Sequence, residues 1–302
     1  MKKNSSNIQS GRTMVVVGEA TNYTYKDHRA MKPILVECPD HPKYSMNNSF
    51  QYADTVKVSK NKKLEYFVPN NISILLSNSQ SALKLAKKMY YEELPKHIEI
   101  IDDKVTERLW DNCTFVSDYI EKIQTAIVFS YTALEAFANI SIPDDYIYLS
   151  KMNSKGIKEQ FDREAIERWL SLKDKLNLVL PEIYKSKQIN KERIWSQFLF
   201  LENYRNQIIH QKAIESTSFY YDYFKPNIFK VLEVSEKIIC FFHDSNDIKS
   251  NDGANVNLMW PWLNGAMTVP ILKTPEPILG WTVIHSAQLD EYLANNPHNK
   301  QG

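Results

Sequence analysis

Residues 103–140 read DKVTERLWDNCTFVSDYIEKIQTAIVFSYTALEAFANI, and this stretch decides the fold. Apolar residues recur along it at every third or fourth position, a spacing typical of one buried face of an amphipathic helix. These residues are Val105, Leu109, Cys113, Val116, Ile120, Ile123, Ile127, Tyr131, Leu134 and Ala138. A helix over the whole stretch would be about 57 Å long at 1.5 Å per residue. We therefore expect a kink or break within it, and Pro143 ends it.

Two further helical segments follow this stretch. Residues 163–180 place Ile166, Trp169, Leu170, Leu176 and Leu180 on an apolar side. Pro181 bends or ends that segment. Asn190 is a suitable N-cap for the next helix. Its heptad-like stripe consists of Ile194, Phe198, Leu201, Arg205 and Ile208.

Helical patterns also occur at both ends of this region. A last helix begins near Pro226, a favourable first-turn residue, and continues to Phe242. Residues 79–94 have helical spacing too, and Pro95 closes that segment. The sequence therefore predicts a four- to five-helix bundle over residues 78–245.

The two flanks of the predicted bundle have a different pattern. Residues 1–77 are strand-rich, because β-branched or aromatic runs alternate there with polar clusters. The runs are MVVVGEATNYTY, PILVEC, ADTVKVS, LEYFV and ISILL. Residues 246–302 begin as a polar linker and continue as a proline-punctuated, β-prone tail. The predicted fold class is α+β, mainly α.

Composition narrows the class of protein. The chain has 302 residues, 43% of them hydrophobic and 24% charged, as in ordinary water-soluble globular proteins. The net charge of +1 provides no overall attraction to nucleic acid or to an anionic membrane. No apolar stretch is long enough to span a membrane, and the three cysteines form no CxxC pair. We expect a cytoplasmic protein that binds no membrane.

Common catalytic motifs are missing from the sequence. It contains no phosphate-cradling glycine-rich loop, no GxSxG and no HExxH, and it has seven glycines in all. The sequence therefore predicts no cofactor and no metal.

The segment YRNQIIH carries the best candidate site, which consists of Arg205, Asn206 and His210. Asn206 and His210 share a helix face, whereas Arg205 and His210 lie roughly 140° apart on an ideal helix. Arg205 thus falls on the core stripe. Because a buried and unpaired guanidinium is costly, this position indicates a cleft or a seam between subunits.

These side chains could cleave RNA without a metal. The ribose 2′-hydroxyl would be the nucleophile, His210 the acid or base, and Arg205 the group that stabilises the charged phosphorane. Asn206 could orient the histidine or the ribose. The alternative is structural: Arg205 pairs with Glu202 or another carboxylate, and His210 favours the negative end of the helix dipole.

Other residues have supporting roles in this interpretation. Glu135 and Asn139 form a polar pair in an apolar helix. They either orient the motif across the bundle or make a buried hydrogen-bond or ion-pair clasp, which could also hold Arg205.

A basic run precedes the motif helix and could guide RNA. It consists of Lys185, Lys187, Lys191 and Arg193. Tyr204, within the motif helix, could offer a ring for base stacking. The alternative interpretation of the basic run is a solvated connector.

The pattern R-N-x-x-x-H at residues 205–210 resembles the R-x4–6-H motif of the HEPN superfamily. The segment YTALEAFANISIP at residues 131–143 is similar to the first long helix of many bacterial HEPN-like proteins. The resemblance covers roughly residues 103–244 and excludes both flanks. It implies an HEPN-like helical bundle that forms a homodimer, with two motifs facing each other across one RNase site.

Many members of that superfamily are toxins or antiviral-defence effectors, and others are binding or dimerisation modules. The resemblance therefore implies a metal-independent endoribonuclease of a bacterial toxin or antiviral-defence system. Its partners would be an RNA substrate and an antitoxin or other defence-system protein. The alternative is a non-catalytic HEPN-like module for dimerisation or partner binding.

Overall fold

The computed structural model describes residues 13–19, 27–36, 48–98, 109–150, 158–210, 214–247, 257, 259–263, 271–272 and 282–283. The chain divides into two compact units. One is Asn71–Ile248, and the other combines Met1–Asn70 with Lys249–Gly302. The described residues are mainly helical with small sheets, which confirms the predicted α+β, mainly α class.

The helical unit opens with α1 (Asn71–Lys88), which continues into a π-helical turn (Met89–Glu93) and a 3-10 turn (Leu94–Lys96). The prediction of a strand for ISILL was wrong, because these residues lie in α1. Burial explains the helix: Ile72, Leu76, Leu83 and Ala86 are buried at helical spacing. A short β-branched run cannot be assigned to strand or helix by composition alone.

Helix α2 (Leu109–Ile140) is continuous, so the break expected in the long stretch is not found among residues 109–140. The predicted stripe is buried from Ile123 to Ala138. At the start of the helix it was wrong, because Leu109 is 69% exposed and Cys113 is exposed as well. Phe115 and Tyr119, each one position before a residue of the predicted stripe, are buried in this half of the helix instead.

The segment after α2 contains a small hairpin and several short helices. Strands β5 (Tyr148–Leu149) and β6 (Gln160–Phe161) pair antiparallel. They are followed by α3 (Arg163–Trp169), α4 (Leu172–Asp174), the π-helical turn η3 (Lys175–Val179) and α5 (Leu180–Tyr184).

The prediction of one helix over residues 163–180 was wrong. The backbone is extended at Leu170 (φ −85°, ψ 138°), and Ser171 accepts a hydrogen bond from the Asp174 amide to start α4. Pro181 does not end the helical region, because it lies in the first turn of α5, directly after the π-helical turn η3.

The candidate motif lies on α6 (Ile194–Ile209). The 3-10 turns η4 (Ile189–Lys191) and η5 (Ile214–Phe219) flank it, and α7 (Tyr220–Tyr223) follows. The prediction of Asn190 as the N-cap was wrong, because Asn190 lies in η4 and Arg193 precedes the first residue of α6. The helix starts without a side-chain cap.

The predicted last helix is two helices, α8 (Asn227–Leu232) and α9 (Val234–Asp247). They separate at Glu233, whose carboxylate accepts from Lys87 Nζ of α1 at 2.7 Å. The Ser130 hydroxyl of α2 donates to the Ser235 hydroxyl of α9 at 2.8 Å.

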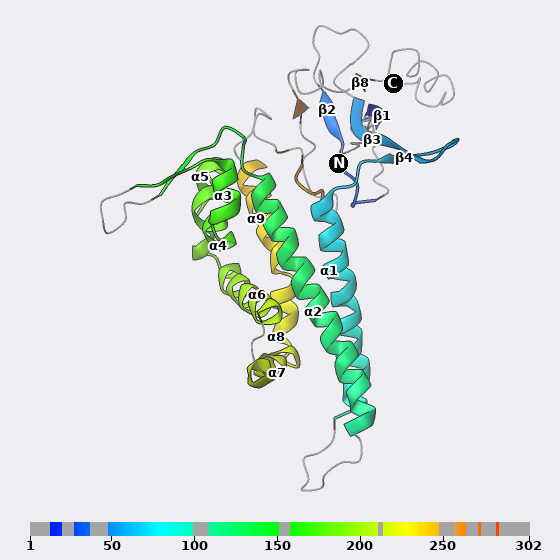
Figure 1. Ribbon diagram of the computed structural model, residues 1–302, viewed down its shortest axis with the longest axis vertical. Helices are drawn as coiled ribbons and strands as arrows, with labels where there is room; N and C mark the ends of the chain where they lie inside the picture. The colour runs from blue at the N-terminus through cyan, green and yellow to red at the C-terminus, as the bar shows by residue number, and fades with distance from the viewer. Residues whose placement is uncertain are drawn as a thin grey trace, which may run out of the picture. The chain divides into compact units, whose positions relative to one another are not determined.

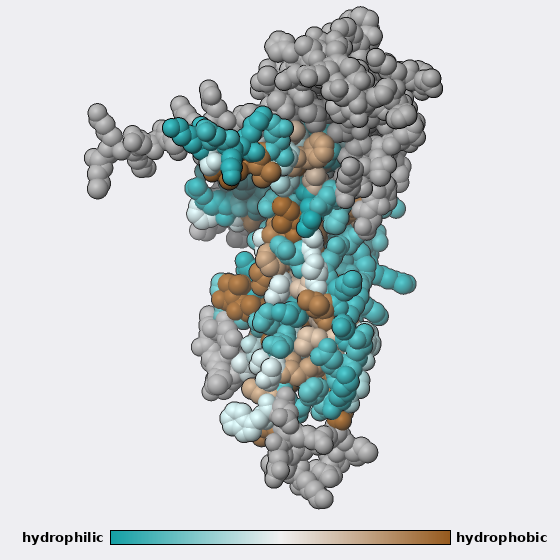
Figure 2. Space-filling view, turned by 90° about the vertical axis from the view of Figure 1, so that its right-hand side faces the viewer, coloured by the Kyte–Doolittle hydropathy of each residue, from teal (hydrophilic) through white to brown (hydrophobic). Residues whose placement is uncertain are grey.

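Helices α1, α6 and α9 pack around α2 (Figure 1). Among the helices that the structure describes, none has both the length and the apolar character needed to cross a membrane. On the face in Figure 2, hydrophilic side chains cover most of the described surface, and hydrophobic ones form separate groups.

The other unit is built on a sheet. Its strands are β1 (Thr13–Glu19), β2 (Ile34–Val36), β3 (Asn48–Ser59), β4 (Lys62–Phe67), β7 (Ile271–Leu272) and β8 (Thr282–Val283). The order is β7-β2-β3-β1-β8, and β4 pairs with β3. The short strands β7 and β8 are parallel to β2 and β1, so both flanks of the chain contribute to one sheet.

Candidate functional site

The C-terminal half of α6 positions the candidate motif. Phe198, Leu201 and Tyr204 are buried and fix the inner face of the helix. The next residue, Arg205, is half-buried, whereas Asn206 and His210 are exposed. His210 ends the helix, and its backbone N–H donates to the Asn206 carbonyl oxygen at 2.9 Å.

Arg205 is held by an aromatic ring. Its Cζ atom lies 5.0 Å from the centroid of the Tyr131 ring on α2, within the range of a cation–π interaction. Its Nη1 atom donates to Asn206 Oδ1 at 3.1 Å. The guanidinium makes no ion pair with any residue that the structure describes. The alternative in which Glu202 neutralises it is therefore not the arrangement found.

Glu202 lies close enough to Arg205 for their charges to interact. Burial raises the pKa of the Glu202 carboxyl, and the Asp174 carboxylate raises it further. Lys173 and Arg205 act in the opposite direction and lower this pKa. Glu202 and Arg205 are thus coupled by charge without forming a salt bridge.

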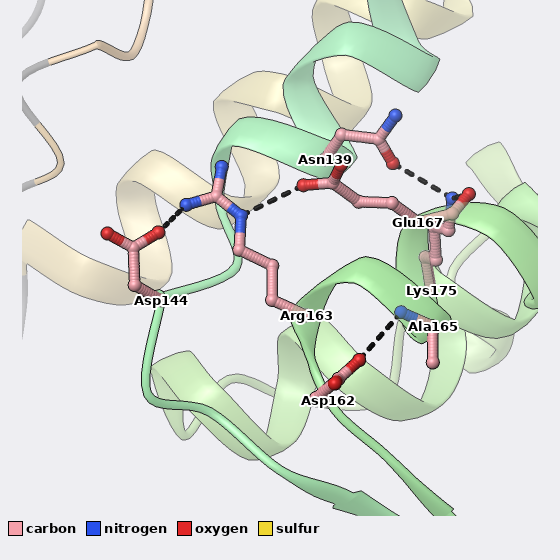
Figure 3. A network of polar contacts seen from close by, with 7 residues as sticks. All are labelled: Asn139, Asp144, Asp162, Arg163, Ala165, Glu167 and Lys175. Atoms are coloured by element: carbon pink, nitrogen blue, oxygen red, sulfur yellow. Dashed lines mark hydrogen bonds and ion pairs between the residues drawn. The ribbon is translucent and has the colours of Figure 1, made fainter.

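The polar pair on α2 contacts a lysine that sequence reasoning missed. Lys175 is only 5% exposed, and its Nζ atom donates to Asn139 Oδ1 at 2.8 Å (Figure 3) and to the Glu167 carbonyl oxygen at 2.9 Å. Burial lowers the pKa of Lys175, while the Glu135 and Glu167 carboxylates partly offset this effect. A clasp exists, but its cation is Lys175 and not Arg205.

A signal for this lysine was present in the sequence. Leu172, Lys175, Leu176 and Val179 are spaced by three, one and three residues, so they lie on one side of a helical turn. All four are buried. A cation within an apolar stripe needs a buried polar partner, and the Glu135 and Asn139 pair was the unassigned polar group in the same bundle.

Acidic residues line a surface depression at the start of α3. They are Asp144, Asp162, Glu164 and Glu167, which surround Arg163. Arg163 forms ion pairs with Asp144 and Glu167, and Asp162 caps α3 by accepting from the Ala165 amide (Figure 3). Nowhere in the described ranges do three His, Cys, Asp or Glu side chains come together in a way that could hold a metal ion.

The predicted RNA-guiding residues lie at the other end of α6 from the motif. Lys185, Lys187, Lys191 and Arg193 are all exposed. Arg193 precedes Arg205 by twelve residues, so about 18 Å of helix separates them. RNA would have to span this distance to touch both.

Tyr204 does not have the open ring face that base stacking requires. It is 6% exposed, and its hydroxyl donates to Asp222 Oδ2 at 3.2 Å. Burial and the Asp222 carboxylate raise its pKa to about 12. The stacking role expected for Tyr204 is corrected to a role in packing α6 against α7.

A scan against protein-family models, a search of curated proteins and a search of solved structures each found no match. A proposed function for this chain therefore rests on the chemistry of its own residues.

The buried lysine predicts a pH dependence of stability. Because the folded protein binds the Lys175 proton less tightly than the unfolded chain does, the unfolded chain carries more protons between the two pKa values. Stability then rises with pH in that window. We expect the free energy of unfolding of the wild type to increase, relative to that of Lys175→Met, as the pH approaches 10.5, the ordinary pKa of lysine.

Urea denaturation of both proteins between about pH 7 and about pH 10.5 measures this difference. The exposed neighbour Lys173 gives a matched control, since Lys173→Met should leave the pH dependence unchanged. Parallel curves for the wild type and Lys175→Met would contradict the assignment.

Proposed function

We propose that this chain is a metal-independent endoribonuclease of the HEPN type, from a bacterial toxin or antiviral-defence system. It would cleave RNA at a dimeric site built from Arg205, Asn206 and His210. One observation carries the proposal: Arg205 lies at the edge of the core over Tyr131 and forms no ion pair with the described residues. A guanidinium held in this way keeps donors available for phosphate oxygens.

The reaction follows from these side chains. A base removes the proton of a ribose 2′-hydroxyl, and the oxygen attacks the adjacent phosphorus. The bond from phosphorus to the 5′-oxygen breaks, and an acid protonates the leaving oxygen. The imidazole of His210 supplies the base or the acid, and the N–H groups of Arg205 stabilise the extra charge on the phosphorane. Asn206 orients the guanidinium through its hydrogen bond.

A dimer would complete this machinery. The motif of one chain contains a single imidazole, whereas the attacking and leaving oxygens lie on opposite sides of phosphorus. A second copy of the motif would supply the second proton-transfer group. Support for association comes from α6, where apolar Leu199, Phe200 and Ile209 are 36%, 48% and 53% exposed.

The purified protein tests the proposal. Incubated with single-stranded RNA and excess EDTA, it should produce fragments that end in a 2′,3′-cyclic phosphate and begin with a 5′-hydroxyl. DNA of the same sequence should stay intact, because it lacks the nucleophile. Cleavage that needs an added metal, or that also cuts the DNA, would contradict the mechanism.

The exposed apolar residues of α6 also favour a second function, a non-catalytic module for dimerisation or partner binding. Phe200→Glu would place a charge in the contact, and we expect it to raise the dimer dissociation constant at least about tenfold. Sedimentation equilibrium measures this constant. Leu85→Glu is the matched control, because Leu85 on α1 is 50% exposed and lies on another helix.

Loss of the dimer in both variants, or in neither, would show that Phe200 does not lie in the dimer contact. A dimer that depends on Phe200 but cuts no RNA would support the module over the nuclease.

A further inference from the structure

A β-ribbon extends from the sheet of the other unit. Strand β3 has twelve residues, but its pairing with the described residues of β1 ends at Ala53. From there to Ser59 it pairs with β4. Figure 1 shows this hairpin running out from the other strands of its sheet. Every side chain from residue 56 to residue 65 is exposed.

The ribbon concentrates positive charge. Residues 55–65 contain four lysines and one glutamate, a formal charge of +3, whereas the whole chain carries +1. Lys63 pairs with Glu65, with 2.5 Å between Nζ and Oε1. Lys57, Lys60 and Lys62 form no ion pair with any residue that the structure describes. Three ammonium groups are thus available to an external anion.

The register of the ribbon places like charges together. Lys57 is directly opposite Lys63, and Val56 is directly opposite Leu64. Residues opposite each other in an antiparallel pair share a face, and like charges in that position destabilise the pairing. The Glu65 carboxylate offsets part of this repulsion at Lys63, and an anion beside Lys57 would offset more of it.

We propose that the ribbon of residues 55–65 binds the phosphate backbone of nucleic acid. The spaced, unpaired lysines suit a chain of regularly spaced negative charges, and such contacts do not depend on base sequence. A two-stranded ribbon also fits the major groove of duplex DNA, which is about 12 Å wide. The ribbon belongs to the unit built on the sheet, and Arg205 and His210 belong to the helical unit. The ribbon's binding role is therefore tested independently of RNA cleavage.

Fluorescence anisotropy of the full-length protein tests this role. The probes are a DNA duplex of about 20 base pairs and an RNA strand of equal length, the latter with His210→Ala in every protein to exclude cleavage. Lys57→Gln/Lys60→Gln/Lys62→Gln should raise Kd at least about tenfold at low salt and reduce the slope of log K against log salt by about 2 to 3. The two probes show which nucleic acid is preferred.

A triple variant with the same total charge is the control. Lys84, Lys88 and Lys158 are exposed lysines of the helical unit, and their replacement by Gln should change Kd less than about twofold. If both triple variants weaken binding equally, or if neither does, the ribbon is not the binding surface.

The single variant Lys57→Glu distinguishes a role of the lysines in nucleic-acid binding from a role in protecting the strand edge against aggregation. Charged residues on an exposed strand edge also prevent aggregation, and Lys57→Glu keeps a charge there. It creates an opposite-charge pair with Lys63, so the melting temperature should stay the same or rise while nucleic-acid affinity falls. Unchanged affinity in this folded variant would overturn the proposal.

Discussion

His210→Ala is expected to slow RNA cleavage by about 10²- to 10⁴-fold, the usual contribution of a general acid or base. The loss should appear in kcat, because the imidazole acts in proton transfer more than in substrate binding. The side chain is exposed and makes no hydrogen bond to the residues that the structure describes. The melting temperature of His210→Ala should therefore equal that of the wild type within experimental error. The cleavage rate is measured with a fluorescence-quenched RNA substrate.

Arg205→Lys tests the other half of the site. Lysine keeps the charge but loses the planar fork of donors and the stacking on Tyr131, so the cleavage rate should fall at least about tenfold. Arg168→Lys is the matched control, because Arg168 is also helical and pairs with Glu164 at 3.0 Å, with its side chain 63% exposed. It should cleave like the wild type.

These variants also decide between the two proposed functions. If the wild type cleaves RNA and folded His210→Ala cleaves it equally fast, the activity belongs to another site. If the wild type does not cleave RNA at all, the non-catalytic module is favoured.

Phe198→Ala is expected to lower the free energy of unfolding by about 3 to 5 kcal/mol, the usual cost of removing a buried phenylalanine side chain. Phe198 is completely buried, and its ring centroid lies 4.9 Å from that of Trp195. The lost contacts hold the inner face of α6, so the position of Arg205 against Tyr131 should loosen as well. Urea denaturation monitored by circular dichroism measures the stability.

Phe200→Ala provides the comparison, because the same residue type lies two positions away and is 48% exposed. Removing the Phe200 ring should lower the free energy of unfolding by no more than about 1 kcal/mol. Both variants are measured at a protein concentration where they have the same oligomeric state. Equal losses for Phe198→Ala and Phe200→Ala would show that α6 is not packed as described.

Local spacing in the sequence predicted several elements correctly. The three-four periodicity of residues 103–140 predicted helix α2, and the run from residue 194 predicted α6. Where it failed, competing local signals were close in strength. ISILL is compatible with strand or helix, and a serine cap within residues 163–180 interrupts an otherwise helical pattern.

The sequence by itself determined which side chains could do chemistry: the pattern YRNQIIH, the polar pair on α2 and the lysines of residues 57–63 are all visible in it. Only the tertiary structure decided their partners. Arg205 lies over Tyr131, Asn139 binds Lys175, and Lys57 faces Lys63. The first two contacts join helices far apart in the chain and the third depends on strand register, so packing and pairing decide them.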